Sequence, residues 1–270
     1  TTLANPVVLP YYPIGTINNV DATTGVADSL GVFCWTSGTV AGIDLDGNAG
    51  LSFTIIDQSG ANPEGINIYN FADISNYVVN EGDSIMVRGK VEQFNGLTQL
   101  FVDSIMVIST GSALPAHTLV TALDETTESQ LIRMENLTVT NVPSGSTKNI
   151  DLFDGTNTFT MRVDADTDVL DSLTFNVGDV ICSVNGIGGQ FDNSNPFTSG
   201  YQIFPMRFSD IDTTSCLTPP TPVIPYYPIG TINTVDATTG IADSLNVTCF
   251  TSGTVAGVDL DGNTGISFTI

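Results

Sequence analysis

The chain repeats a long stretch of its own sequence. Residues 8–55 recur at residues 223–270 without a gap, and 39 of the 48 positions are identical. Chance does not produce a match of this length, so the natural repeat is about 215 residues long. Because the chain has 270 residues, it holds one full repeat, here defined as residues 8–222, and the beginning of a second.

The second copy stops at Ile270, inside a run with the pattern of a strand. A sheet that ended there would leave backbone groups unpaired and half of a core uncovered. We therefore expect the polypeptide to continue into further repeats. The alternative is that this run completes a sheet in a neighbouring molecule by strand donation.

Short runs rich in β-branched and aromatic residues, separated by Gly, Asn, Asp and Pro, indicate an all-β fold. Asp46-Gly47 and Asn95-Gly96 are turn signals, because such dipeptides tolerate positive φ in tight hairpins. Five strands with a short helix after the third is the order of an OB-fold barrel. We predict strands of the first domain near 30–43, 51–57, 65–71, 84–93 and 97–108, with a short helix within 72–80. We predict strands of the second domain near 130–141, 147–153, 158–163, 178–187 and 199–208.

The repeat itself divides into two related halves. Gly82-Asp83 opens a run similar to the run that Gly178-Asp179 opens. We therefore predict tandem five-stranded OB-fold-like Greek-key barrels over residues 1–110 and 111–215, joined by Pro-rich linkers. Residues 216–270 then hold a linker and a partial copy of the first barrel. The closely spaced prolines before residue 226 favour polyproline II, which makes a semi-rigid spacer.

Both domains contain short motifs built from turns and strand residues. Those in the first domain are 38–42 (GTVAG), 53–57 (FTIID), 65–69 (GINIY), 82–83 (GD) and 94–100 (FNGLTQL). Those in the second domain are 123–124 (LD), 177–179 (VGD), 200–205 (GYQIFP) and 210–211 (DI). These motifs resemble those of OB-fold domains found in tandem in secreted proteins of Gram-negative bacteria, often in large surface proteins or beside extracellular nucleases. The resemblance implies secretion and modular construction, and it does not imply that these domains are enzymes.

The charge of the chain is strongly one-sided. Six basic residues face 29 acidic ones, which gives a formal net charge of -23. Such a surface repels phosphate backbones and anionic membranes, so we expect neither nucleic acid nor membrane insertion. We expect the partners to be copies of the chain, or the following repeats of it, arranged end to end.

No constellation of catalytic residues stands out. His117 is the only histidine, and the sequence has no P-loop, no dinucleotide fingerprint and no Cys-x-x-Cys motif. We therefore expect no catalysis, no catalytic residues and no cofactor apart from calcium as an option. His117 lies in the loop between the two domains, and we interpret it as a solvated linker residue.

The best metal candidates alternate along one loop that occurs in both copies. Side-chain oxygens at such spacing can supply several ligands to Ca²⁺. The same residues also suit a β-turn built on Asp-Gly, and we favour that alternative. The candidate ligands are Asp44, Asp46 and Asn48 in the first copy, and Asp259, Asp261 and Asn263 in the second.

Aromatic residues lie on the strands that OB-folds use to bind ligands. With few basic residues near them, we interpret Phe53, Tyr69 and Phe71 as core or domain-packing residues. In the first strand, alternation with period two favours Val32 and Cys34 as inward-facing. Trp35 has the opposite parity, so either a β-bulge buries it or it is an exposed aromatic that packs on a neighbouring domain.

The cysteines and one short motif complete the candidate sites. We expect Cys34 and its copy Cys249 to be buried thiols, and the disulfide state of Cys182 and Cys216 stays open. Asp-Ser-aliphatic triplets resemble the O-glycan acceptor pattern of some Gram-negative surface proteins. They begin at Asp28, Asp83, Asp103, Asp171 and Asp243.

Taken together, these features favour a structural role. We expect a repeat of a secreted extracellular filament or giant surface adhesin, located at the cell surface. The alternatives are a module that binds glycan or calcium, and an accessory module of a larger secreted hydrolase or nuclease.

Overall fold

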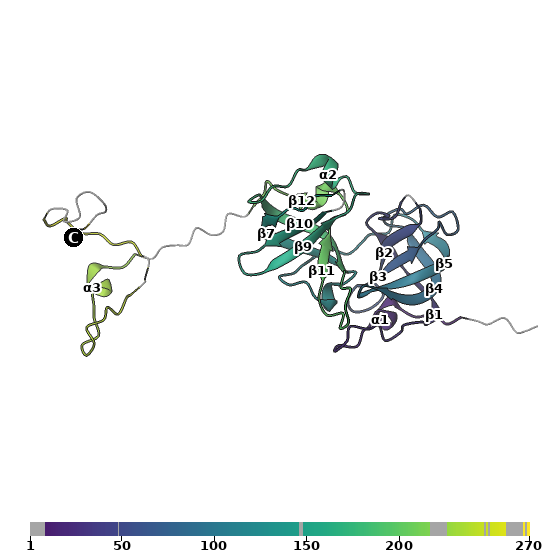
Figure 1. Ribbon diagram of the computed structural model, residues 1–270, viewed down its shortest axis with the longest axis horizontal. Coiled ribbons are helices and arrows are strands. Elements are labelled where there is room, and N and C mark those ends of the chain that lie inside the picture. The colour runs from purple at the N-terminus through teal and green to yellow at the C-terminus, as the bar shows by residue number, and fades with distance from the viewer. Residues whose placement is uncertain are drawn as a thin grey trace, which may run out of the picture. The chain divides into compact units, whose positions relative to one another are not determined.

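The computed structural model describes residues 9–47, 49–145, 148–216, 226–245, 247, 249–257, 267 and 269–270 (Figure 1). The chain divides into a first unit, Thr1–Cys216, and a second unit, Leu217–Ile270. The first unit contains two β-barrels, here called barrel 1 and barrel 2. The Pro-rich segment 217–225, predicted to be a semi-rigid linker, lies outside the described residues.

Barrel 1 is a closed five-stranded barrel. Its strands follow the order β1-β2-β3-β5-β4, and β1 pairs with both β2 and β4 to close the ring. All neighbouring strands are antiparallel except β3 and β5, which are parallel. A short helix, α1, precedes the first strand. The elements are α1 Ile14–Ile17, β1 Phe33–Ala41, β2 Leu51–Asp57, β3 Glu64–Asn70, β4 Ser84–Phe94 and β5 Leu97–Ser109.

Barrel 2 repeats this arrangement. Its sheet has the order β12-β10-β11-β9-β8-β7-β6, and a further pairing of β10 with β7 closes a five-stranded ring. As in barrel 1, the third and fifth strands of the ring are parallel. The barrel elements are β7 Leu131–Asn141, β8 Lys148–Phe153, β9 Thr158–Val163, α2 Val169–Ser172, β10 Val180–Gln190 and β11 Tyr201–Phe204. The flanking elements are β6 Thr118–Leu119, η1 Glu125–Thr127, η2 Phe208–Asp210 and β12 Ile211–Asp212.

These pairings confirm the predicted fold class, which is all-β with tandem five-stranded OB-fold-like barrels. Figure 1 shows the two barrels side by side within the first unit. The short helix predicted after the third strand is present in barrel 2 as α2. The strands lie within a few residues of the predicted ranges because β-branched runs and turn residues specify them locally.

The helix predicted within 72–80 of barrel 1 is wrong. The described segment forms bends and turns, and Ser75 and Asn76 have positive φ values of 59° and 50°. Residues in this conformation cannot continue a right-handed helix. The segment is held instead by Tyr77, whose hydroxyl donates to Asp83 Oδ2 at 3.1 Å and whose ring lies 6.0 Å from Phe53.

The alternation predicted for β1 is present. Cys34 is buried in the core, whereas Phe33 and Trp35 face outwards. Val32, the residue before β1, is partly buried and packs against the core. Register shifts interrupt the pairing of β4 with β5 but not that of β1, so no bulge reverses the parity of Trp35. Trp35 is half-buried beneath Arg88, whose guanidinium lies 5.4 Å from the ring centroid.

The two turn signals behave differently. Asn95 and Gly96 have φ values of 49° and 91° and join β4 to β5 in the tight turn that was predicted. Asp46-Gly47 lies in the longer loop between β1 and β2, where the N–H groups of Ala49 and Gly50 donate to the Asp46 carbonyl.

A disulfide joins Cys182, in β10, to Cys216, which follows β12. It resolves the question that the sequence left open for these two residues. The bond closes a loop with a sequence separation of 34 and fixes the end of the first unit to the wall of barrel 2. Cys34 is a buried free thiol as predicted, whereas Cys249 is a partly exposed one.

The second unit reproduces the local contacts of the first copy. A short helix, α3 Ile229–Ile232, corresponds to α1, and the Tyr226 hydroxyl lies 2.8 Å from Ser252 Oγ, as Tyr11 does from Ser37. The burial of its side chains differs: Val255 is 56% exposed, whereas Val40, its equivalent in barrel 1, is fully buried. Local turns and bridges are therefore encoded by the repeated sequence, while burial of the core requires the remaining strands of a barrel.

Candidate functional site

The loop predicted to bind calcium forms a turn around Asp44. The Asp44 carboxylate accepts the backbone N–H groups of Asp46 at 3.1 Å and Ser52 at 2.8 Å, and burial raises its pKa. Among the residues that the structure describes, no group of three or more His, Cys, Asp or Glu side chains is placed to hold a metal. Calcium binding stays a prediction. Asn48, Asp259, Asp261 and Asn263 lie outside the described residues.

His117 is half-buried rather than solvated, which corrects the interpretation drawn from its place in a connecting loop. Burial lowers the pKa of its imidazole, and the charges of Asp210 and Glu81 oppose that effect. Glu81 also accepts the N–H of Gly42 and pairs with Arg207, each at 3.0 Å. His117 thus lies near an ionic contact that joins the two barrels.

The aromatic residues predicted to be core or packing residues divide into two groups. Phe53 is buried in the core of barrel 1. Tyr69, Phe71 and Phe101 form a cluster on the outer surface, with ring centroids 5.3 to 6.3 Å apart. Phe71 is 70% exposed, so its ring is not a core residue.

The serines of the Asp-Ser-aliphatic triplets differ in their surroundings. Ser172 is exposed at the end of α2, whereas Ser84 and Ser104 lie within β4 and β5 and are half-buried. No described helix is long and apolar enough to cross a membrane.

The two barrels of the first unit share an apolar cluster. It contains Ala41 and Ile56 from barrel 1 and Leu131, Ile187 and Met206 from barrel 2. Backbone hydrogen bonds also link barrel 2 to barrel 1 and to the segment before it, including those from Asp192 N to the Asn95 carbonyl at 2.6 Å and from Phe197 N to the Thr24 carbonyl at 2.8 Å. An apolar contact of this kind restricts the motion that separate domains otherwise show.

Two glycines allow a segment of barrel 2 to pass between the barrels. A Cβ atom on Gly65 in β3 would lie 1.8 Å from the Ser129 carbonyl oxygen, and one on Gly188 in β10 would lie 1.8 Å from that of Thr127. Residues 127–130 therefore fit between β3 of barrel 1 and β10 of barrel 2 only because both positions lack a side chain.

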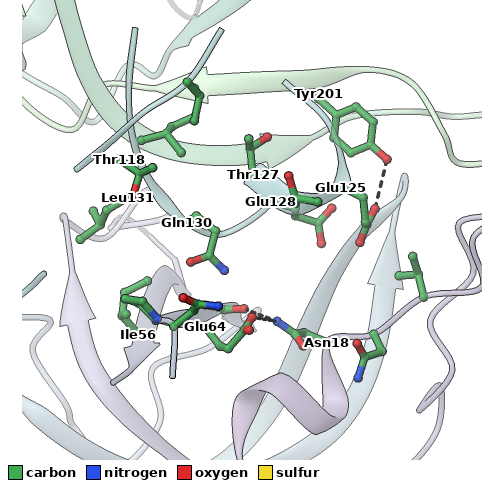
Figure 2. Close-up of a pocket in the computed structure, with 18 of the residues that line it drawn as sticks. Asn18, Ile56, Glu64, Thr118, Glu125, Thr127, Glu128, Gln130, Leu131 and Tyr201 are labelled. Carbon is green, nitrogen blue, oxygen red and sulfur yellow. Dashed lines mark hydrogen bonds between the residues drawn. The ribbon is translucent and has the colours of Figure 1, made fainter. Parts of the chain in front are cut away.

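A cleft of about 730 Å³ opens beside this segment (Figure 2). Its volume is in the range of small-ligand sites. Its walls combine carboxylates, amides and hydroxyls with apolar residues of the connecting loop. The acidic and amide residues that line it are Asn18, Asn19, Asp21, Asn62, Glu64, Glu125, Glu128 and Gln130, and the apolar ones include Ile56, Pro63, Pro115, Ala116, Val120 and Leu131.

Glu128 is the most unusual residue of the cleft. Its side chain lies in the segment that passes between the barrels and is only 7% exposed. Oε1 accepts the backbone N–H of Thr98, in β5 of barrel 1, at 3.0 Å, while Oε2 has no hydrogen-bond partner among the described residues. Burial raises the pKa of Glu128 to about 8, and the charge of Glu125 adds to the effect.

Glu125 lies next to Glu128 at the start of η1. It accepts a hydrogen bond from the Tyr201 hydroxyl at 3.1 Å, and burial raises its pKa. The pKa of Tyr201 is raised as well, first by burial and then by the charge of Glu125. On the opposite side of the cleft, Asn18 Nδ2 donates to Glu64 Oε2 at 3.4 Å (Figure 2).

Sequence reasoning did not identify this cleft. Its acidic residues come from the loop between α1 and β1, from β3 of barrel 1 and from the segment before β7 of barrel 2, which lie far apart in the sequence. The sequence signal that could have pointed to the cleft is the pair Glu125 and Glu128. These residues lie in the segment that joins the two domains, in a chain with few basic residues. Nothing in the sequence indicates that β3 packs against this pair.

Comparison with known proteins finds similar solved structures only. No family model matches the chain, and no curated protein matches it. The p204 HINb domain has 10% identity and a TM-score of 0.31, with coverage of 66% of this chain and 94% of that domain. The tetrameric p202 HIN2 has 13% identity and a TM-score of 0.31, with coverage of 63% and 85%. A murine DNA-binding protein bound to double-stranded DNA has 8% identity and a TM-score of 0.32, with coverage of 63% and 90%.

The prediction that the chain has no nucleic-acid partner was drawn from its net charge, and it is wrong. One of the similar structures is a DNA-binding protein in complex with double-stranded DNA. An acidic net charge describes the whole chain and does not settle what a particular surface binds. At this level of identity and structural similarity, the comparison does not give this chain a DNA-binding function.

Proposed function

We propose that the chain is a structural repeat of a secreted filament or large adhesin at the cell surface. In this proposal each repeat, equivalent to residues 8–222, contributes a stiff pair of OB-fold-like barrels, and the repeats follow one another along the polypeptide. The role is to span distance, and it involves no catalysis.

The observation that carries the proposal is the apolar cluster shared by the two barrels. Burial of a Leu, Ile or Met side chain contributes about 1.5–3 kcal/mol, so the four larger residues of the cluster favour one arrangement of the barrels over separate motion. The ion pair between Glu81 and Arg207 and the segment 127–130 add polar and steric constraints. In a pair of barrels built in this way, the orientation of one barrel fixes the orientation of the other.

The disulfide between Cys182 and Cys216 supports the proposed location. Such bonds persist mainly in oxidising compartments, including the periplasm and the cell exterior. This one fixes the chain where it leaves barrel 2 and enters the segment that leads to the next copy. A fixed exit direction is useful in an extended array.

Electron microscopy of the natural full-length protein tests the proposal. We expect elongated particles or fibres with a regular axial period, one for each repeat of the sequence. Compact particles without an axial period would contradict it.

A second candidate function is a ligand-binding module, which the acidic cleft favours. The cleft has the size of a small-ligand site and contains a buried carboxyl group, one oxygen of which has no hydrogen-bond partner in the part of the chain that the structure describes. This function is compatible with a structural role, because the cleft lies within the first unit.

A further inference from the structure

The cleft between the barrels is lined by carboxyl groups on both sides. Glu64 projects from β3 of barrel 1, and Glu125 and Glu128 come from the segment before β7 of barrel 2 (Figure 2). Among the described residues that line the cleft, no Lys, Arg or His side chain is present to neutralise these groups. Buried carboxylates normally have a cationic or hydrogen-bonding partner, because an unpaired buried charge is costly.

Glu128 gives the second, independent observation. The residue is more than nine-tenths buried, and its Oε2 has no partner among the described residues, although Oε1 is satisfied by the Thr98 N–H. Because Glu128 lines the cleft, a donor bound there can supply the missing partner once neighbouring side chains move aside. A cationic donor gains most, because charge-assisted hydrogen bonds are the stronger kind.

The shape of the cleft argues against a single metal ion as this donor. Calcium takes six to eight oxygen ligands at about 2.3–2.6 Å, which requires the ligands to converge on one point. Among the described residues, no group of three or more His, Cys, Asp or Glu side chains converges in this way. Instead, Glu64 and the pair Glu125 and Glu128 lie on opposite sides of a space of about 730 Å³.

Apolar residues also line this cleft. Pro115, Ala116 and Val120, from the loop that connects the barrels, line the same cleft. A cleft that has carboxyl groups on two sides and apolar residues in its lining matches a molecule whose ammonium groups are joined by methylene chains. The methylenes would cover the apolar wall, and the ammonium groups would meet the carboxylates.

We propose that the cleft between the barrels binds a linear polyamine, with one ammonium group at Glu125 and Glu128 and another at Glu64. This site goes beyond the structural role and does not depend on it, because it lies within the first unit alone. Its failure would therefore leave the filament proposal standing.

Isothermal titration calorimetry with spermidine at pH 8.5 and low salt tests the proposal. We expect one saturable site per chain, with affinity at least tenfold weaker in the Glu128→Gln and Glu64→Gln variants. The matched control is Asp73→Asn, which removes the same charge from an exposed residue outside the cleft. Butylamine, with a single ammonium group, should bind at least tenfold more weakly than spermidine.

Three results would overturn the proposal. The first is that Asp73→Asn weakens binding as much as Glu128→Gln, which would mean nonspecific attraction to an acidic protein. The second is that butylamine binds as well as spermidine. The third is that Ca²⁺ binds with the same dependence on Glu64 and Glu128 and displaces spermidine stoichiometrically. Circular dichroism of each variant shows whether it is folded, and Glu64→Gln provides the test if Glu128→Gln is not.

Discussion

At the scale of single residues, Glu128 is the residue whose ionisation at high pH conflicts with its burial. It accepts a hydrogen bond across the barrel junction from Thr98, and it is buried close to a second carboxyl group, Glu125. In the unfolded chain its pKa has the ordinary value of 4.5, whereas burial in the folded chain raises the pKa to about 8. The folded protein therefore keeps a proton that the unfolded chain has already lost at neutral pH.

This difference predicts how stability depends on pH. The Glu128 carboxyl group makes its full contribution to the free energy of unfolding below pH 4.5. That contribution is lost as the pH rises to about 8. Each unit of pKa difference corresponds to about 1.4 kcal/mol, so the loss amounts to a few kcal/mol. In the Glu128→Gln variant, which cannot ionise, we expect the free energy of unfolding to fall much less between pH 5 and pH 8.5.

Urea unfolding at several pH values measures this effect. The Asp73→Asn variant, which changes an exposed carboxylate, should follow the wild-type pH dependence. Equal slopes for wild type and Glu128→Gln would show that Glu128 does not retain its proton in the folded protein.

At the scale of elements, the sequence specifies where each strand lies along the chain better than it specifies which elements pack together. The strands of both barrels follow from local runs, and the turn at Asn95 and Gly96 follows from its dipeptide. The helix predicted within 72–80 fails because Ser75 and Asn76 adopt a left-handed conformation that composition does not reveal. The cleft was not predictable, because it forms only when β3 packs against the segment before β7.

Gly65 tests the packing of that segment. A Cβ atom there would lie 1.8 Å from the Ser129 carbonyl oxygen, so one of the two backbone segments would have to shift. We expect Gly65→Ala to destabilise the first unit by about 1–3 kcal/mol, the usual cost of overpacking. Gly60→Ala is the control, because the nearest atom there is 3.4 Å away in a loop. If the two variants had equal urea midpoints, the packing described for β3 would be incorrect.

The disulfide of barrel 2 gives another prediction about how elements are held together. Replacing Cys182 and Cys216 by Ser removes a crosslink that closes a loop with a separation of 34, at an expected cost of about 2–4 kcal/mol. Thermal unfolding should show the lower stability without added reductant, whereas Cys249→Ser should leave the melting temperature unchanged. A wild-type protein whose melting temperature is insensitive to reductant would contradict the stabilising role of this bond.

For the molecule as a whole, the proposed role depends on how barrels and repeats are joined. Within the first unit, a shared apolar cluster and an ion pair connect the barrels. Between copies, the sequence of residues 8–55 returns at 223–270, and the second copy reproduces the local contacts of the first. A polypeptide of several repeats is therefore expected to be a row of stiff barrel pairs.

Small-angle X-ray scattering from chains with one, two and three consecutive repeats is the decisive test of this arrangement. Stiff pairs in a row predict that the maximum dimension increases by a nearly constant amount with each added repeat. A compact body would instead show a radius of gyration that grows only as about the 0.38 power of chain length. Constant increments would support the proposed spacer role, and the shallow power law would contradict it.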